Sequence, residues 1–519
     1  MAQQPNSNRR RWTIMAALVV ILAAIASPAG AQDDAAPPTN AVQVTQNTDP
    51  LRAHSSPQIN VHPETGELVV VEGEARQSRR CKVHLSEDDG RTWVRGGDLM
   101  PAAHSDCTLS GEYGPYVTST FAADGTLYVA FVASRHPAQA QAVQISHPLP
   151  QQHRHVYLAR SEDGGRTFDT TMVYEADFAD SNRYLNKGPM LAVDPSDSSR
   201  VYVGWRQGDI RTDAKLLTNV AASDDGGETF SDPVDISQEA GGDYPALAVT
   251  PDGTLHAVYW ERDHAIEGEP PREIMYTRSA DGGASFTEPT TIDPGNQSTS
   301  RPPLLAADAD NGNLYMVWFA NQEVRNVDAE EPQRHDILLR ASRDGGDTWQ
   351  DRRVLNEDLD ANQFDPGIAV APSGHIDVAW YDFRHSPTPP ADVSGQGGED
   401  GVAHVYYTYS TDGGETFAPD QRISDRGIDR SVGVWSNNIS SKFNIGVAAT
   451  DDRAYFAWQD TRNADPELQA EDVYMASRPH AARDDGDTSG LMARVQGAGI
   501  ALTAGGLLLA GVARRVRRR

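Results

Sequence analysis

One eight-residue motif occurs six times in this chain and constrains its fold more than any other feature. The motif reads Ser-x-Asp-x-Gly-x-Thr-aromatic, with Ser in place of Thr in one copy. Six copies in a common register indicate a repeat architecture, in which each repeat is one supersecondary unit. The copies begin 75, 62, 56, 63 and 68 residues apart, at Ser86, Ser161, Ser223, Ser279, Ser342 and Ser410.

The composition of the motif predicts a rigid hairpin turn. Ser and Asp side chains accept hydrogen bonds from nearby backbone N–H groups and hold a turn in place. Glycine supplies the positive φ that such a turn needs, and the closing aromatic residue begins the next strand and packs between sheets. The predicted structural aspartates are Asp88, Asp163, Asp225, Asp281, Asp344 and Asp412.

Short strands of regular spacing surround each motif. A small-residue strand, such as Tyr244–Val249, comes first, and a second strand that ends in an aromatic residue follows, as in Val201–Trp205. A third strand runs into the motif and a fourth leaves it. Four strands per unit, seven units and no helices predict an all-β fold, namely a β-propeller of four-stranded blades. Seven blades are expected, or six if the first or last unit is peripheral.

The last unit is incomplete in the sequence. It has a third strand at Val473–Ser477 but neither a turn motif nor a clear fourth strand. Ala41–Thr45, near the start of the chain, alternates apolar and polar residues as a strand does. We expect this strand to complete the last blade, because closing the ring removes an exposed sheet edge.

Both ends of the chain have the pattern of targeting segments. Arg9–Arg11 precede an apolar run and the small residues Ala29–Ala31, which is typical of a secretory signal peptide. Near the other end, 19 uncharged residues are followed by five arginines, which predicts a membrane-spanning helix with a cytoplasmic tail and an extracellular propeller. The predicted segments are 1–31 signal peptide, 32–40 linker, 41–480 propeller, 481–494 acidic spacer, 495–513 transmembrane helix and 514–519 basic tail.

Charge and cysteine content limit the partners of this protein. The net charge of −29 repels nucleic acid, so no nucleic-acid partner is expected. The expected partners are a glycan or a surface protein bound at the propeller, and the membrane. Cys81 and Cys107 are the two cysteines, and in an exported protein they form one disulfide or remain separate buried thiols. A loop rich in histidine lacks the spacing of a metal site, and Asp308–Gly312 lacks the distal Glu of a calcium loop. No metal and no cofactor are therefore predicted.

Strand direction predicts which face carries function. Successive strands in a blade are antiparallel, so the motif turns share one face, and the loops between second and third strands lie on the other. The two long insertions, Ser134–Arg154 and Ser386–Ala403, are loops of this second kind. Charged residues gather at the same face: Arg206, Glu261, Arg262, Arg301, Arg384, Arg462, Asp382 and Asp460. They suit recognition of a carboxylate and of sugar hydroxyls, or they form structural ion pairs between blades.

The six motifs resemble the Asp boxes, or BNR repeats, of the sialidase (neuraminidase) superfamily, and the resemblance covers about residues 41–480. It implies an exo-α-sialidase-like bacterial surface protein that hydrolyses terminal sialic acids, with an arginine clamp for the carboxylate, a tyrosine nucleophile and an aspartic acid/base. Tyr381 or Tyr244 would be the nucleophile, and Asp382 or Asp460 the acid/base. The sequence departs from the family at its Phe-Arg-Ile-Pro motif, where Leu51–His54 stands, and at the expected nucleophile, where Phe443 stands.

Two functions follow from these patterns. The first is an exo-glycosidase that acts on terminal sialic acid or another acidic glycan. The alternative is a non-catalytic propeller that binds a glycan or a protein at the cell surface. An arginine cluster around one point, above a Tyr–Glu pair, favours the enzyme. Arginines that are all engaged in ion pairs favour binding or a structural role.

Overall fold

The fold was analysed in a computed structural model. It describes residues 40–74, 80–100, 117–133, 155–176, 186–208, 216–238, 241–261, 273–294, 303–320, 335–386, 401–433, 445–464, 467–468 and 470–480. Strands are the regular elements of these segments, and none of them contains a helix suited to crossing a bilayer. The predicted signal peptide, acidic spacer, transmembrane helix and basic tail lie outside the described residues.

The strands form seven antiparallel sheets of at least four strands each; six follow chain order, and the seventh takes its outer strand from the start of the chain. Blade 1 contains β2 (His54–Val61), β3 (Leu68–Glu74), β4 (Arg80–Ser86) and β5 (Val94–Arg95), and blade 2 contains β6 (Val117–Phe121), β7 (Leu127–Ala133), β8 (His155–Ser161) and β9 (Asp169–Tyr174). Blade 3 contains β10 (Asn186–Asp194), β11 (Asp197–Gln207), β12 (Leu217–Ser223) and β13 (Val234–Asp235). Blade 4 contains β14 (Ala246–Val249), β15 (Leu255–Trp260), β16 (Ile274–Ser279) and β17 (Thr290–Asp293).

The remaining three blades follow the same order. Blade 5 contains β18 (Leu304–Ala307), β19 (Leu314–Ala320), β20 (Asp336–Ser342) and β21 (Arg353–Val354). Blade 6 contains β22 (Gln363–Val370), β23 (Ile376–Asp382), β24 (Val402–Ser410), β25 (Gln421–Arg422) and the short β26 (Ile428–Asp429), which also pairs with β24. Blade 7 contains β27 (Gly446–Ala449), β28 (Arg453–Asp460), β29 (Asp472–Pro479) and, as its outer strand, β1 (Val42–Gln43).

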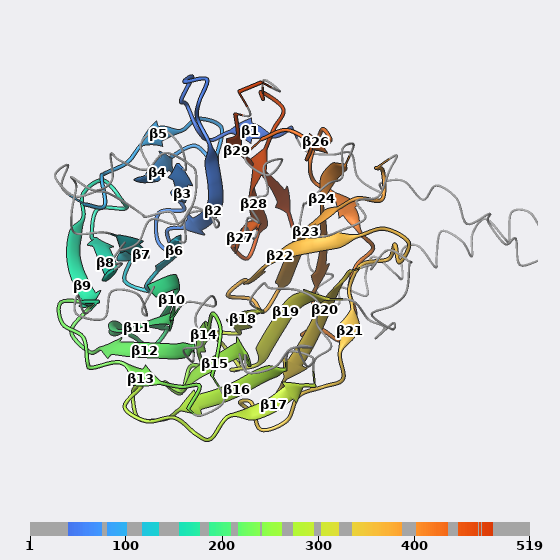
Figure 1. The fold of residues 1–519 in the computed structure, drawn as a ribbon. Helices are drawn as coiled ribbons and strands as arrows, with labels where there is room; N and C mark the ends of the chain where they lie inside the picture. Colours follow the sequence, from blue (N-terminus) through green and yellow to red (C-terminus); the bar gives the residue numbers. More distant parts are fainter. Residues whose placement is uncertain are drawn as a thin grey trace, which may run out of the picture.

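The seven sheets stand in a ring, with the first strand of each toward the centre (Figure 1). These inner strands contact one another in sequence, and β27 contacts β2 to complete the circle. β1 pairs with β29 through Val42 opposite Met475 and Gln43 opposite Tyr474. The prediction of a seven-bladed propeller is thus confirmed, and the N-terminal strand closes it as expected.

Small residues in the inner strands let neighbouring blades approach closely. A Cβ atom on Gly367 of β22 would lie 2.0 Å from the carbonyl oxygen of Ile445, and one on Gly446 of β27 would lie 2.6 Å from that of Pro57. Such contacts are too short for any side chain, so glycine is required where blades 6, 7 and 1 converge on the axis. Outside this inner ring, apolar side chains fill the spaces between blades. The largest are the fully buried Trp205, Trp260, Trp318, Trp380 and Trp458 on the second strands.

All six turn motifs adopt one hydrogen-bonding pattern. In the third copy, Asp225 Oδ1 accepts from Ser223 Oγ at 2.7 Å and from the backbone N of Thr229 at 2.9 Å, while its Oδ2 accepts from Thr229 Oγ1 at 2.5 Å. The Ser223 hydroxyl in turn accepts from the backbone N of Gly227 at 2.8 Å. These bonds explain the motif completely as a turn. The corresponding bonds are present at Asp88, Asp163, Asp281, Asp344 and Asp412.

Candidate functional site

The candidate site lies at the face opposite the six turns, which we call the mouth. Each second strand ends there and each third strand begins there. The predicted site residues Arg206, Tyr244, Glu261, Asp382 and Asp460 lie at strand ends on this side. Arg262 and Arg301 lie outside the described residues, as does the long insertion at 134–154.

Asp382 and Arg384 form part of a hydrogen-bonded brace at the end of β23. The Asp382 carboxylate, fully buried, accepts from the indole Nε1 of Trp380 at 3.1 Å, from the backbone N of Arg384 at 2.8 Å and from Arg384 Nη2 at 2.7 Å. Arg384 also donates to Asp420 Oδ2 at 2.6 Å, and its guanidinium lies 3.9 Å from the centre of the Tyr406 ring. Burial raises the pKa of Asp420 to about 6, although Arg384 opposes this shift.

The same brace recurs in blade 7. Asp460 Oδ2 accepts from Trp458 Nε1 at 2.9 Å and from Arg462 Nη2 at 2.7 Å, and its Oδ1 accepts from the backbone N of Arg462 at 2.8 Å. Arg462 also pairs with Asp425 at 2.9 Å and lies 4.0 Å from the centre of the Tyr474 ring. Asp425 follows the outer strand of blade 6, so this ion pair joins two blades. Both copies of Trp-x-Asp-x-Arg therefore have the contacts of a structural motif.

Arg206 and Tyr244 are also buried. Arg206, 1% exposed, donates from Nη1 to Asp243 Oδ1 at 2.8 Å and packs on the Tyr244 ring at 4.5 Å. Asp243 precedes blade 4, so the contact ties blades 3 and 4 together. Glu261 is partly buried, and its backbone bridges to Gly242 beside this pair. The arrangement holds the junction together rather than presenting a cation to the mouth.

Tyr381 occupies a position that is unsuited to a nucleophile. It is 1% exposed, and its hydroxyl donates to the carbonyl oxygen of Gln459 at 3.2 Å and accepts from the Gln459 backbone N at 3.1 Å. Burial strongly raises the pKa of the Tyr381 phenol, which keeps it neutral. The hydroxyl joins β23 of blade 6 to β28 of blade 7.

A second group of charges lies at the mouth, and the sequence did not point to its members Arg430 and Glu471. Arg430, which follows β26, places its guanidinium 5.0 Å from the Phe364 ring and 5.4 Å from the Tyr381 ring. Burial lowers the pKa of Arg430 to about 10, while the charges of Tyr381 and Glu471 oppose the shift. Glu471 is fully buried, and so is Asp365, which has a φ of 55° beside Phe364. We call Arg430, Glu471, Asp365, Phe364 and Tyr381 the mouth cluster.

The backbone holds the mouth cluster where three blades meet. The Arg430 N donates to the carbonyl oxygen of Gly401 at 2.8 Å, which fixes Arg430 beside the start of β24. Glu471 and Ala53 form an isolated parallel bridge, and the N of His54 donates to the carbonyl oxygen of Glu471 at 3.2 Å. The cluster thus spans blade 6, blade 7 and the entry to blade 1. Charged groups are costly to bury, and their concentration in one place is typical of functional sites.

Blade 1 contributes a buried carboxylate between two imidazoles. Glu72 Oε1 lies 2.9 Å from His54 Nδ1 and 3.2 Å from His84 Nε2. Burial by itself raises the pKa of Glu72, but the charges and hydrogen bonds of the two histidines outweigh it and lower the pKa to about 2. Burial alone would lower the pKa of His54. The negative charge of Glu72 and its hydrogen bond to His54 outweigh burial, so the pKa of His54 is raised.

These shifts predict a pH window in which Glu72 stabilises the fold most. Because the pKa of Glu72 is lowered in the folded protein, Glu72 stabilises the fold at pH values above its ordinary pKa of 4.5. This stabilisation is lost as the pH falls through about 2. Because the pKa of His54 is raised in the folded protein, His54 stabilises the fold at pH values below its ordinary pKa of 6.5. This stabilisation is lost as the pH rises through the pKa of His54 in the folded protein. Glu72→Gln should therefore destabilise the protein most between pH 4.5 and 6.5, by on the order of 3 kcal/mol. Chemical denaturation of both proteins from pH 3 to 9 measures this difference, and a difference that does not change with pH would contradict the pairing.

The predicted disulfide falls partly outside the described residues. Cys81 on β4 is disulfide-bonded. Cys107 lies in the segment 101–116, which the structure does not describe.

Comparisons with known proteins support the resemblance to sialidases over part of the chain. A sialidase of Micromonospora viridifaciens is 30% identical over 122 residues, which are 21% of this chain and 18% of the sialidase. No known family profile matches the chain. The chain is a seven-bladed β-propeller with local sequence similarity to a sialidase.

Several solved structures also resemble the chain. A Hadza microbial sialidase is 18% identical, with 66% of each chain covered and a TM-score of 0.42. An α-L-arabinanase of Penicillium chrysogenum is 14% identical, with 66% of this chain and 92% of the arabinanase covered and a TM-score of 0.42. A PL25 ulvan lyase is 12% identical, with 83% of this chain and 97% of the lyase covered and a TM-score of 0.45. The propeller assignment rests on the strand pairing described above.

Proposed function

We propose that this protein binds glycans at its mouth, through the mouth cluster where blades 6, 7 and 1 meet. The observation that carries the proposal is the gathering of Arg430, Glu471 and Asp365 at this point, beside the aromatic rings of Phe364 and Tyr381. Arg430 is the partly exposed member of the cluster, and a guanidinium pairs with the carboxylate of an acidic sugar. The buried carboxylates and rings would hold Arg430 in place at the mouth. Sialylated glycans are therefore the first class of ligand to test.

The contacts of the other arginines favour binding over hydrolysis. Arg206, Arg384 and Arg462 are each engaged by a buried aspartate, so none of these three supplies a clamp for a substrate carboxylate. Tyr381 and Tyr244 are each 1% exposed, so neither hydroxyl is accessible to a substrate as a nucleophile. Hydrolysis of a terminal sialic acid remains a second candidate function because of the local similarity to a sialidase.

Binding to sialyllactose by wild-type protein and two arginine variants tests the proposal. Arg430→Gln removes the cation of the mouth cluster and should weaken binding by at least about tenfold, which corresponds to 1.4 kcal/mol for a charge-assisted contact. Arg430→Lys retains the charge and should show a smaller loss. Arg343→Gln is the matched control, because Arg343 lies on the opposite face, where it pairs with Glu415. Titration calorimetry gives the affinities, and thermal unfolding establishes that each variant is folded.

The outcomes separate the two functions. No binding of sialyllactose or of any glycan on an array would overturn the proposal, and so would equal binding by wild type and Arg430→Gln. Release of the fluorogenic group from a sialoside by wild-type protein, abolished in Arg384→Ala at unchanged stability, would establish the hydrolase instead. We expect binding without release.

We also propose that the propeller is exported and held at the membrane by residues 495–513, as the sequence patterns predict. The support is the arginine-flanked apolar segment at each end of the chain. Fractionation of expressing cells and protease treatment of intact cells test this arrangement. Recovery of the full-length chain in the cytosol would contradict it.

A further inference from the structure

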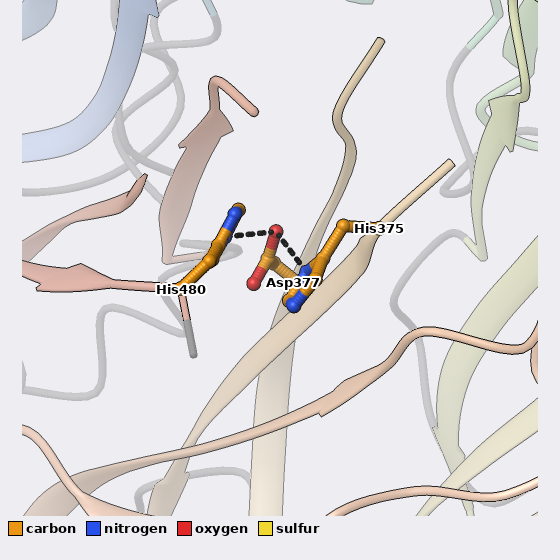
Figure 2. Close-up of side chains that lie close together, drawn as sticks. All are labelled: His375, Asp377 and His480. Carbon is orange, nitrogen blue, oxygen red and sulfur yellow. Dashed lines mark hydrogen bonds and ion pairs between the residues drawn. The ribbon is translucent and has the colours of Figure 1, made fainter. Parts of the chain in front are cut away.

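A second cluster of functional groups lies at the opposite end of the propeller, where blades 6 and 7 meet. His375 immediately precedes β23, Asp377 is the second residue of that strand, and His480 immediately follows β29. Figure 2 shows the two imidazoles on either side of the Asp377 carboxylate. The cluster is far from the mouth, because strands β23 and β29 run between the two faces.

Three metal-ligating atoms converge in this cluster. Asp377 Oδ2 lies 3.2 Å from His375 Nδ1 and 3.2 Å from His480 Nε2, and one ligand atom from each residue falls within 4.8 Å of the others (Figure 2). Ligands of a tetrahedral zinc ion, at about 2.0–2.1 Å from the metal, lie about 3.3 Å from each other. The observed separations match that spacing and exceed the ~2.8 Å expected for a charge-assisted hydrogen bond.

Neighbouring groups fix the orientation of two of these ligands. His480 Nδ1 lies 3.0 Å from the carbonyl oxygen of Asp451, which only accepts hydrogen bonds, so Nδ1 carries the proton. In the neutral imidazole, Nε2 then presents a lone pair to the Asp377 carboxylate, which is also an acceptor. The Tyr407 hydroxyl donates to Asp377 Oδ1 at 2.6 Å and leaves Oδ2 directed at both histidines. Outer contacts of this kind orient the ligands in metal sites.

A divalent cation suits the space between these three ligand atoms. The Asp377 side chain is fully buried and those of the two histidines are 5–6% exposed, so water screens the contact poorly. The imidazole rings of His375 and His480 stack with centroids 3.7 Å apart, an arrangement that disfavours two imidazolium charges. One divalent ion would contact all three ligand atoms at once. The competing arrangement is a protonated His480 that donates from Nε2 to Asp377, with His375 donating to Asp377 from Nδ1.

We propose that His375, Asp377 and His480 bind one divalent transition-metal ion, with Zn²⁺ the best match to two imidazoles and a carboxylate. The fourth position of the tetrahedron is left for water. The ion would join the end of β29 in blade 7 to blade 6, near the point where the ring closes. The site is independent of glycan binding at the mouth, and 105 residues separate its two histidines, so no local motif reveals it.

Zinc titration of the full-length protein after dialysis against EDTA tests the site. We expect one Zn²⁺ per chain by calorimetry and elemental analysis, with a Tm that rises on binding. His480→Ala and His375→Ala should each weaken zinc binding by more than about tenfold. His62→Ala is the matched control, since His62 lies in a turn at the same end of the propeller and contacts the ring of Phe121 instead. It should bind zinc as the wild type does.

The measurement distinguishes a metal site from a protonated histidine pair. A wild type that binds no zinc stoichiometrically, or an unchanged zinc affinity in His480→Ala, would overturn the proposal. The Tm of each variant in EDTA, compared with that of the wild type in EDTA, shows whether lost binding reflects lost folding. Substitution with Co²⁺ gives a second readout, because a tetrahedral site produces intense visible absorption that a protonated pair does not.

Discussion

Val44→Asp should destabilise the propeller by at least about 4 kcal/mol, because it places an unpaired carboxylate in a closed core. Val44 has no exposed surface, and its backbone N donates to the carbonyl oxygen of Val473 at 2.8 Å. Its side chain belongs to the apolar cluster between blades 7 and 1. A charge at this position would displace the N-terminal strand and expose the outer edge of β29. The loss of stability therefore measures how much this strand contributes to closing the ring.

Val94→Asp provides the matched control for this experiment. Val94 lies on β5, the outer strand of blade 1, and is 62% exposed. The same substitution there should change stability by less than about 0.5 kcal/mol. Thermal and denaturant unfolding measure both effects. Equal stability of the two variants would show that the N-terminal strand does not close the ring.

Asp382→Ala should cost about 3–5 kcal/mol of stability, since it breaks a buried ion pair and leaves one partner charged. The substitution removes the acceptor for the Trp380 indole, for the Arg384 backbone N and for the Arg384 guanidinium. Of its two carboxylate partners, Arg384 would retain Asp420. Asp460→Ala should give a loss of similar size, because it breaks the equivalent brace in blade 7.

This experiment separates the structural interpretation of the motif from the catalytic one. Asp351→Ala, at an exposed position of blade 5, makes the same change outside any such brace and should leave stability nearly unchanged. A catalytic acid at Asp382 predicts a different result, in which turnover is lost while the unfolding midpoint stays at the wild-type value or rises. Denaturant unfolding of the four proteins decides between the two roles.

The fold was predictable because its determinants are local and repeated. Each turn motif closes its own hydrogen bonds within seven residues, as Ser223 to Thr229 does, so the pattern in the sequence fully specifies the turn. The closing strand was predictable for a different reason. One blade lacked an outer strand and one unassigned strand remained at the start of the chain.

The candidate site was only partly predictable, because its contacts join distant residues. The motif Trp-x-Asp-x-Arg fits both a substrate clamp and an ion pair, and only the partners Asp420 and Asp425 favour the structural role. Arg430 and Glu471 lie in segments without a recognisable pattern, and the packing of blade 6 against blade 7 brings them together. The same holds for His375 and His480.

The position of a bound glycan in a crystal of the complex tests the central claim most directly. With sialyllactose, the account predicts ligand density at the mouth between blades 6, 7 and 1, with the sugar carboxylate at Arg430. Two results would contradict it. One is a ligand held by Arg384 and Arg462, with both arginines no longer paired with their aspartates. The other is a ligand bound on the face that carries the six turns.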